Sequence, residues 1–363
     1  MSRIGLVLEG GSFRGIFTAG VLDSLLEHHI SFPYVIGVSA GSGNAVNFIA
    51  GQEGRTKKVI THENADAYYG LGTLRNNGKV LDLDQMLAYD KEPLNFDSFF
   101  ASDVEREFVA VNCETGKAEY LTDDGTAESI LQICKASCSV PLMCAPVKIG
   151  GKAYLDGSIV DSIPYERAFE RGCDKVVVVQ TRKAGEAPTD YSKMKLLLNV
   201  CYHSTYPKVA EVMVERRYNY DKQMRRLEEL EQDGKAIIIR PEIGSIGHFE
   251  NDVEKINDFY KHGYELMEKN MDNGELVVDD LVRELAVSRS VFFKKLKTLT
   301  GLAPIEFIKE MRIKRAAQLI ETGEFNMTQI SYMVGINDPR YFSKCFKAQV
   351  GMTPTEYREK VGR

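Results

Sequence analysis

The sequence has no long hydrophobic run and few residues suited to disulfides or metal sites. Glu9 and Arg14 interrupt the apolar segment near its start, and no segment approaches the roughly 20 apolar residues that a membrane-spanning helix needs. The seven cysteines are odd in number and include no C-x-x-C pair, which favours reduced thiols. Cys134 and Cys138 lie one helical turn apart without a histidine cluster, so no metal site is predicted. With 44% hydrophobic and 27% charged residues, we expect a soluble, globular, cytoplasmic protein.

Charge is distributed unevenly along the 363 residues. The net charge is -6, yet residues 1–271 hold 31 Lys and Arg against 40 Asp and Glu, and residues 272–363 hold 15 against 12. After Ser288 the basic excess sharpens to 14 against 7, which predicts an anionic partner for this end. A turn signal, Met-Asp-Asn-Gly, occupies residues 271–274. We therefore expect two domains, residues 1–271 and 272–363.

Strand-like and helix-like segments alternate through the first domain. Buried strands are expected at residues 3–8, 34–38, 107–112, 174–180 and 235–240, with helical stretches between most of them. This alternation predicts an α/β fold with a mainly parallel sheet covered by helices on both faces. Such sheets bind ligands beyond the carboxyl ends of their strands.

A serine crowded by glycines follows the second expected strand. Residues 35–44 read VIGVSAGSGN, and a helix is expected to begin directly after Ser39. Gly37-x-Ser39-x-Gly41 is the pattern of a nucleophile elbow, in which small neighbours allow a strained backbone and an exposed hydroxyl. The same string also occurs in ordinary glycine-rich turns.

A second glycine-rich turn follows the first expected strand. Residues 8–15 read LEGGSFRG and lead into a helix, so free backbone N–H groups and the positive helix end are expected to bind negative charge. The anion is either a nucleotide phosphate or the oxyanion of an acyl-transfer intermediate, and the spacing matches neither common nucleotide motif. Arg14 either reinforces this site or forms a surface ion pair.

A serine nucleophile needs a base, and the sequence offers two kinds. None of the six histidines lies in a glycine-rich or strand-end context, although His203 and His248 follow Ser39 in the order of an α/β-hydrolase. Asp156 ends a short apolar segment and precedes Gly157, which places a carboxylate on a tight turn. Aspartate before glycine is also an ordinary turn former, so both kinds of candidate stay open here.

The last ninety residues show two helix-turn-helix patterns. A short helix, a turn and a basic helix beginning at Ser288 occupy residues 278–301. The pattern repeats at residues 327–349, after a connecting helix at residues 304–321. Such units place their second helix in the major groove of DNA, so an all-α DNA-binding domain is expected.

The first domain resembles the patatin-like phospholipases over roughly residues 3–270. The residues that carry this resemblance are Glu9 to Gly15, Gly37 to Gly41, Ala136 to Pro141, and Asp156-Gly157. The resemblance implies a three-layer α/β/α fold and a Ser-Asp dyad without metal or cofactor. Ser39 would attack an acyl carbonyl and Asp156 would be the general base. The oxyanion hole would be formed by Gly10, Gly11, Ser12 and Arg14.

Two residues depart from the family pattern. Ser12 stands where the family usually has a third glycine, and Ser158 replaces the second glycine of the usual Asp-Gly-Gly. If the backbone at residue 12 has a positive φ, serine strains the loop. Asp161 is expected to be structural rather than a second base.

The C-terminal domain resembles the AraC-type DNA-binding domain throughout. GINDPRYFSKCFKAQVGMTPTEYR, residues 335–358, is close to that family's signature. The resemblance implies that DNA faces Arg289, Ser290 and Lys294 on one helix and Arg340, Ser343 and Lys344 on the other. Phenylalanines 292, 342 and 346 are expected in the core, and the lysines on phosphates.

Together these features predict a serine acyl hydrolase of the phospholipase A, lysophospholipase or esterase type, fused to a sequence-specific DNA-binding domain. The alternative is a transcription regulator whose first domain senses a lipid or acyl ligand, and an engineered or misassembled join near residue 271 also stays open. The expected partners are a lipid or acyl ester, double-stranded DNA and, peripherally, a membrane. Phe96, Phe99 and Phe100 either line a lipid pocket or belong to the core.

Overall fold

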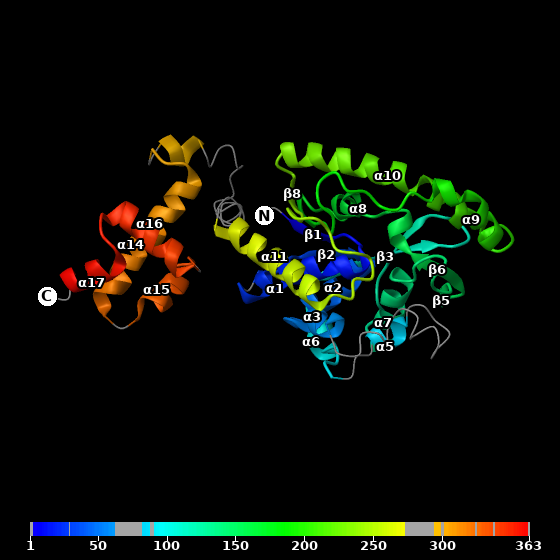
Figure 1. Cartoon of the computed structure of the whole chain (residues 1–363), viewed down its shortest axis with the longest axis horizontal. Coiled ribbons are helices and arrows are strands. Elements are labelled where there is room, and N and C mark those ends of the chain that lie inside the picture. The colour runs from blue at the N-terminus through cyan, green and yellow to red at the C-terminus, as the bar shows by residue number, and fades with distance from the viewer. Residues whose placement is uncertain are drawn as a thin grey trace. The chain divides into compact units, whose positions relative to one another are not determined.

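The computed structural model describes residues 3–28, 30–61, 82–87, 91–272, 294–298, 301–323, 325–336 and 338–361 (Figure 1). These residues form two compact units that divide between residues 267 and 268, inside α11 (Val253–Asp272). The domain boundary at residue 271 stays a prediction.

An eight-stranded, mostly parallel sheet forms the N-terminal unit. Its strands run in the order β5-β6-β3-β2-β1-β7-β8, and β4 pairs with β3. The five expected strands are confirmed as β1 (Ile4–Leu8), β2 (Tyr34–Val38), β3 (Glu105–Asn112), β7 (Lys175–Val179) and β8 (Ala236–Ile239). The pairs that join these five strands are all parallel. Three antiparallel strands that were not predicted complete the sheet: β4 (Ala118–Leu121), β5 (Val147–Ile149) and β6 (Lys152–Asp156).

Strand β3 changes its partner halfway along its length. Val38, the last residue of β2, pairs with Val109, and from Ala110 onward the same edge of β3 pairs with β6. The other edge is occupied by β4 over this stretch. Asp156 pairs with Ala110, the position that Ser39 would reach if β2 continued by one residue. The register of β3 therefore brings the two residues to the same level.

Helices cover both faces of the sheet. The alternation of Lys175–Val179 sends Val176 and Val178 to one face, where they pack with residues of α8 (Tyr165–Glu170) and α10 (Pro207–Gln232). Figure 1 shows α1, α2 and α11 on the opposite side of the strands. The helices of this unit not yet given bounds are α1 (Gly15–Glu27), α2 (Ala40–Ile49), α3 (Arg55–Ile60), α5 (Leu83–Leu87), α6 (Phe96–Ala101), α7 (Ala127–Ser137) and α9 (Lys195–Tyr202). The layers are those of the predicted α/β/α fold.

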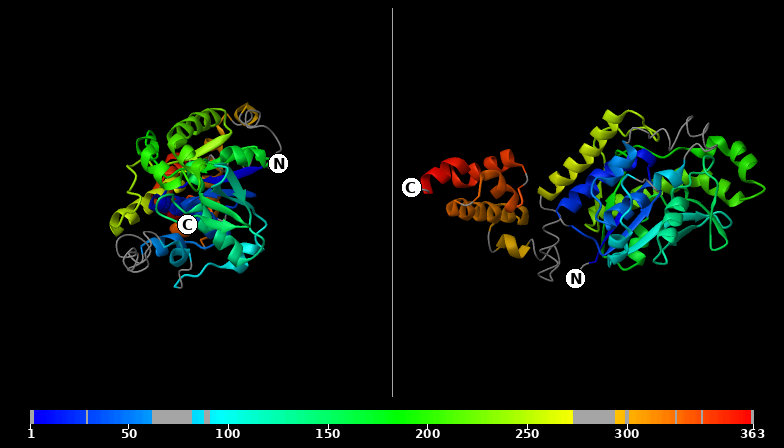
Figure 2. Two further views of the ribbon diagram at one scale, coloured as in Figure 1. Left: turned by 90° about the vertical axis from the view of Figure 1, so that its right-hand side faces the viewer. Right: turned by 90° about the horizontal axis from the view of Figure 1, so that it is seen from below.

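The described part of the C-terminal unit is helical (Figure 2). It consists of residues 294–298, α14 (Pro304–Thr322), α15 (Met327–Met333), α16 (Pro339–Val350) and α17 (Pro354–Val361). Phe342 and Phe346 are fully buried in its core, as predicted, and Phe292 lies outside the described residues. The second helix-turn-helix unit, α15 and α16, therefore has the expected form.

Two features bear on the sequence analysis. None of the seven cysteines, all of which lie among the described residues, forms a disulfide. Among the helices that the structure describes, none combines the length and hydropathy needed to cross a membrane.

Candidate active site

Ser39 occupies a strained turn between β2 and α2. Its φ of 55° and ψ of -127° are unusual for a residue with a side chain. Gly37 and Gly41 permit this turn, because a Cβ on Gly37 would lie 2.5 Å from the Gly41 carbonyl oxygen, and one on Gly41 would lie 2.3 Å from that of Leu8. The predicted elbow geometry is therefore present.

The Ser39 hydroxyl donates a hydrogen bond to Asp156. The distance from Oγ to Oδ2 is 2.7 Å, and the side chains are both buried. The other carboxylate oxygen accepts from the backbone N–H of Ser158 at 2.8 Å, which fixes the orientation of the carboxylate. The structure thus brings together two residues separated by 117 positions in the chain.

The environment of Asp156 favours its action as a base. Burial raises the pKa of the Asp156 carboxyl, and the hydrogen bonds from Ser39 and Ser158 oppose this rise. A carboxylate with a raised pKa accepts a proton from a hydroxyl more readily. The arrangement is suited to proton transfer between these two side chains.

Ser137 and Cys138, at the C-terminal end of α7, support the elbow. The Ser39 backbone N–H donates to the Ser137 hydroxyl at 2.9 Å, and that hydroxyl donates to the Val109 carbonyl at 2.6 Å. The Cys138 thiol donates to the Ser39 carbonyl at 3.1 Å. The segment from Ala136 to Pro141 was singled out in the sequence, but neither residue was given a role. Their function as positioning residues depends on tertiary contacts.

The glycine-rich loop after β1 lies against the elbow. A Cβ on Gly10 would lie 2.8 Å from the Ser39 Cβ, so only glycine fits there. Gly11 and Ser12 line a cavity together with Ser39 and Asp156. Their backbone N–H groups make no hydrogen bond to any residue that the structure describes. Free donors beside the serine are the arrangement that an oxyanion hole requires.

Ser12 adopts a positive φ of 51°. The sequence analysis expected strain in this conformation, because serine has a Cβ that glycine lacks. A side chain in the left-handed region costs roughly 1–2 kcal/mol. The loop therefore holds this conformation at an energetic cost.

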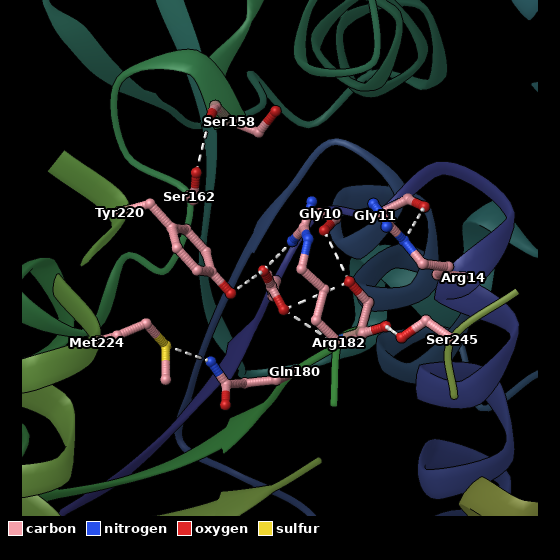
Figure 3. A network of polar contacts seen from close by, with 12 residues as sticks. Gly10, Gly11, Arg14, Ser158, Ser162, Gln180, Arg182, Tyr220, Met224 and Ser245 are labelled. Carbon is pink, nitrogen blue, oxygen red and sulfur yellow. Dashed lines mark hydrogen bonds and ion pairs between the residues drawn. The ribbon is translucent and has the colours of Figure 1, made fainter. Parts of the chain in front are cut away.

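Arg14 is buried, which excludes the surface ion pair, one of the two alternatives that the sequence left open. Its Nε donates to the Gly11 carbonyl at 3.3 Å, and its terminal nitrogen lies 3.3 Å from Nε2 of His248. Burial and the nearby Arg182 lower the pKa of Arg14 to about 10, which leaves it charged at neutral pH. Arg14 is bonded to the loop that carries the free N–H groups (Figure 3).

The histidine candidates occupy other positions. His203 is exposed at the C-terminal end of α9. His248 lines the cavity, but its ring contacts Arg14, and the Ser39 hydroxyl donates to Asp156 instead. Burial and the Arg14 guanidinium lower the pKa of His248 to about 4, so its ring is neutral at pH 7. Asp161 accepts hydrogen bonds from Tyr120 and Gln223, in keeping with the expected structural role.

Two cavities of different chemistry flank Ser39. The first, which we call the arginine cavity, has a volume of about 210 Å³. Its polar lining includes Ser39, Asp156, Arg182, Arg216 and His248.

The second, which we call the apolar cavity, has a volume of about 90 Å³, and its lining includes Leu83, Met86, Leu94, Ile130 and Leu131. A smaller cavity lined by Ser12, Ser39, Ala40, Leu83 and Met86 shares lining residues with each of the two larger cavities. The site therefore has a polar and an apolar side.

The phenylalanines of residues 96–100 are not part of either lining. Phe99 is fully buried, and the Arg106 guanidinium lies 4.2 Å from the centre of its ring. Phe96 and Phe100 stack on each other in α6. Of the two interpretations offered by the sequence, the core is favoured.

The predicted DNA-facing residues are described only in part. Arg340 and Lys344 are exposed on α16, one turn apart, while Phe342, Cys345 and Phe346 of the same helix are buried. Ser343 is half-buried, and its hydroxyl donates to the Pro339 carbonyl. Lys294 is exposed, and Arg289 and Ser290 lie outside the described residues. An exposed basic stripe on α16 is therefore present.

Three family models match the chain. A patatin-like phospholipase model matches residues 6–169, which include Ser39 and Asp156. A helix-turn-helix domain model matches residues 281–360, and a model for a domain of unknown function matches residues 206–275.

Several curated proteins are similar to parts of the chain. Histidine kinase P4 of Formosa agariphila is 46% identical over 100 residues, 28% of this chain and 7% of that protein. Uncharacterized protein YjjU of Escherichia coli K12 is 34% identical over 188 residues, 49% of this chain and 52% of that protein. Lysophospholipase NTE1 of Candida glabrata is 25% identical over 283 residues, 72% of this chain and 15% of that protein.

The chain spans between 7% and 52% of the length of these three relatives. The matches nevertheless fall on both of its parts. The chain carries a patatin-like phospholipase domain, residues 6–169, followed by an AraC-type helix-turn-helix domain, residues 281–360.

Proposed function

We propose that the N-terminal unit is a serine acyl hydrolase that cleaves lipid esters through a Ser-Asp dyad. One observation carries the proposal: the 2.7 Å hydrogen bond from the Ser39 hydroxyl to the buried Asp156 carboxylate. The free N–H groups of Gly11 and Ser12 beside it supply the second requirement of acyl transfer. The patatin-like family match and the lysophospholipase among the relatives support the same chemistry.

In the proposed reaction, Ser39 and Asp156 act in two half-reactions. Asp156 removes the hydroxyl proton as Oγ bonds to the ester carbonyl carbon, and the N–H groups of Gly11 and Ser12 stabilise the oxyanion. The carbon–oxygen bond to the alcohol then breaks, and Asp156 returns its proton to the departing oxygen. Water, deprotonated by Asp156, attacks the acyl-enzyme, and Asp156 gives that proton to Ser39 Oγ as the bond between Oγ and the acyl carbon breaks and the fatty acid leaves.

The apolar cavity supports a lipid as the acyl donor. Its lining of leucine, isoleucine and methionine suits a hydrocarbon chain, and it shares Ser12 and Ala40 with the smaller cavity that Ser39 lines. The substrate class is therefore an acyl ester of the phospholipid, lysophospholipid or simple ester type. Release of fatty acid by the full chain, and its loss when Ser39 is replaced by alanine, tests this proposal.

For the C-terminal domain we propose sequence-specific binding of duplex DNA by α16 and by the helix that includes Lys294. The exposed stripe of Arg340 and Lys344 supports it, since arginine and lysine contact bases and phosphates. In the alternative function the first domain only senses a lipid or acyl ligand and DNA binding is the output. The assembled dyad favours the enzyme. We propose a cytoplasmic location, where such a domain meets DNA.

DNA binding should weaken with salt and with loss of either basic residue. A plot of log affinity against log salt concentration has a negative slope. For Arg340→Ala and Lys344→Ala, we expect the magnitude of this slope to decrease by about one for each phosphate contact that is lost. Fluorescence anisotropy with a labelled duplex measures this slope, and Lys208→Ala on α10 is the matched control. Binding that is unaffected by salt and by both substitutions would contradict the proposal.

We also propose that α9 contacts a membrane. Leu196 and Val200 are 85% and 81% exposed on this helix, and the exposed Lys193 and Lys195 shortly precede Leu196 in the sequence. Apolar side chains with adjacent lysines suit an anionic lipid surface. Tyr191, four residues before the start of α9, lines the arginine cavity, so this helix is close to the site in sequence.

Leu196→Asp and Val200→Asp should each lower the affinity for anionic vesicles by about tenfold or more, because each removes a side chain whose burial contributes roughly 1.5–3 kcal/mol. Vesicle sedimentation measures the affinity. Tyr218→Asp, which also replaces an exposed apolar residue, is the control. Equal sedimentation of all variants would exclude α9 as the membrane contact.

A further inference from the structure

Ser158, which follows Asp156 by two residues, is held through its backbone and its side chain. Its N–H donates to the Asp156 carboxylate at 2.8 Å. Its carbonyl accepts from the Ser162 hydroxyl at 2.6 Å (Figure 3) and from Arg216 Nε at 3.1 Å. Its hydroxyl accepts from a terminal nitrogen of Arg216 at 3.3 Å. Arg216 therefore makes two of the contacts that fix the turn carrying the proposed base.

This arginine comes from α10, a helix that packs against the sheet. Arg216 is 8% exposed, and Tyr220 and Leu227 of the same helix are buried in the core cluster that includes strand residues. The turn also packs tightly on β3, because a Cβ on Gly157 would lie 2.5 Å from the Val109 carbonyl oxygen. A guanidinium group presents planar donors in a fixed geometry, so it can hold two acceptors at once. The turn is thus fixed by a strand and a helix.

Arg216 also acts on the charge of Asp156. Burial raises the pKa of the Asp156 carboxyl, and the hydrogen bonds from Ser39 and Ser158 and the positive charge of Arg216 oppose this rise. In return, burial lowers the pKa of Arg216, and the negative charge of Asp156 opposes that fall. Each group therefore favours the charged form of the other.

The other titratable groups near Asp156 come from several elements. They are Cys138 after α7, Arg182 after β7, Tyr191 before α9 and His248 before α11. Burial raises the pKa of the Cys138 thiol well above its usual value, and burial and Arg14 lower the pKa of His248 to about 4. Both are therefore neutral at pH 7, and Arg182 forms an ion pair with Glu9. Among these groups of the described chain, Arg216 is the cation that bonds to the turn of Asp156.

We propose that Arg216 is a positioning residue of the dyad: through Ser158 it orients the Asp156 carboxylate, and its charge keeps that carboxylate ionised. This rests on the proposed hydrolase function and adds a residue to its machinery. The Ser158 hydroxyl belongs to the same arrangement, since it supplies the second acceptor of Arg216. Glycine at this position would remove that acceptor.

The pH profile of kcat/KM for a soluble ester tests the proposal in the full chain. Only ionised Asp156 accepts the Ser39 proton, and loss of the positive charge in Arg216→Gln raises the Asp156 pKa. The acid limb should therefore move to higher pH by about one unit. Arg216→Lys keeps the charge and should leave the limb in place while lowering kcat, because an ammonium group lacks the paired donors.

The matched control is Arg217→Gln, which replaces the neighbouring exposed arginine that pairs with Asp221. Its profile should equal that of the wild-type protein. All profiles are measured at a temperature at which circular dichroism shows each variant to be folded. An acid limb at the same pH in Arg216→Gln and in the wild-type protein would overturn the proposal. A raised KM with an unshifted limb would overturn it in favour of substrate binding by Arg216.

A double-mutant cycle tests the route through Ser158. Ser158→Ala removes the hydroxyl and should lower kcat by about threefold, as expected for one hydrogen bond. Combined with Arg216→Gln, it should add little to the loss caused by Arg216→Gln alone, because both substitutions remove the same contact. Fully additive losses would show that Arg216 does not act through this residue.

A measurement without substrate separates this proposal from the hydrolase function. In the full chain with isotope-labelled aspartate carboxyl groups, the NMR signal that is missing from Asp156→Asn belongs to Asp156. We expect this signal to titrate at higher pH in Arg216→Gln than in the wild-type protein, whether or not the chain hydrolyses esters. Equal titration in both proteins would overturn the proposal even if hydrolysis is observed. Shifted titration without hydrolysis would support the role of Arg216 and contradict the hydrolase function alone.

Discussion

Asp156→Asn is expected to lower the rate of ester hydrolysis by about 10²- to 10⁴-fold, the usual contribution of a general base. Asparagine retains the shape of aspartate and an oxygen for the Ser158 N–H, but it has no basic oxygen to accept the Ser39 proton. Ser39→Ala removes the nucleophile and should reduce the rate by up to about 10⁶-fold. Steady-state hydrolysis of a soluble ester measures both.

Asp161→Asn is the control for this prediction. Asp161 is also a buried carboxylate in the same segment, but its hydrogen bonds come from Tyr120 and Gln223. We expect the Asp161→Asn variant to retain the rate of ester hydrolysis at temperatures at which the variant is folded. Equal losses for Asp156→Asn and Asp161→Asn would mean that the loss reflects folding rather than base catalysis.

The pH dependence of hydrolysis follows from the same carboxylate. Only ionised Asp156 accepts the proton, so activity should fall on acidification through its pKa, which burial places above the ordinary value. His248 has a pKa of about 4 and stays neutral above it, so His248→Gln should leave the position of the acid limb unchanged. Loss of the acid limb of the pH profile in His248→Gln would mean that His248, and not Asp156, is the group whose titration lowers the activity.

Glu9→Ala is expected to destabilise the N-terminal unit by about 3–5 kcal/mol, because it leaves Arg182 charged and buried without its partner. Glu9 is fully buried directly after β1, and Arg182 follows β7. The Glu9 carboxylate also accepts hydrogen bonds from the Thr181 N–H at 2.7 Å and the Tyr220 hydroxyl at 3.0 Å. One carboxylate thus joins two strand ends and α10.

Urea unfolding of the full chain, followed by circular dichroism, measures this loss. The control is Lys58→Ala, which breaks the ion pair between Lys58 and Glu92. The Lys58 side chain in this pair is 55% exposed. We expect that variant to lose about 0–1 kcal/mol. A loss of similar size in both variants would contradict the central role of Glu9.

The nucleophile could be predicted from sequence because its chemistry is local. Ser39 needs a strand, a tight turn and a helix within ten residues, and the glycines that permit this turn are its direct neighbours. The resemblance to a known family then selected Asp156, which local reasoning had left beside two histidines. The parallel strands were predictable for a similar reason, since runs such as residues 176–179 of β7 are continuously apolar and buried.

The antiparallel strands and the charged side of the site could not be predicted in this way. β4 is half-buried throughout and β5 has three residues, so neither carries a clear apolar pattern. Arg182 and Arg216 lie on different elements and belong to no motif. They line one cavity only because β7 ends and α10 passes beside the same sheet edge.

The most direct test of the dyad is the reaction of the full chain with a fluorophosphonate. Formation of the Oγ–phosphorus bond expels fluoride and leaves a covalent adduct that mass spectrometry locates on a peptide. We predict one adduct, on Ser39, forming faster as pH rises and strongly slowed in Asp156→Asn. An adduct on another serine, or labelling of Ser39 at an unchanged rate in Asp156→Asn, would contradict the account.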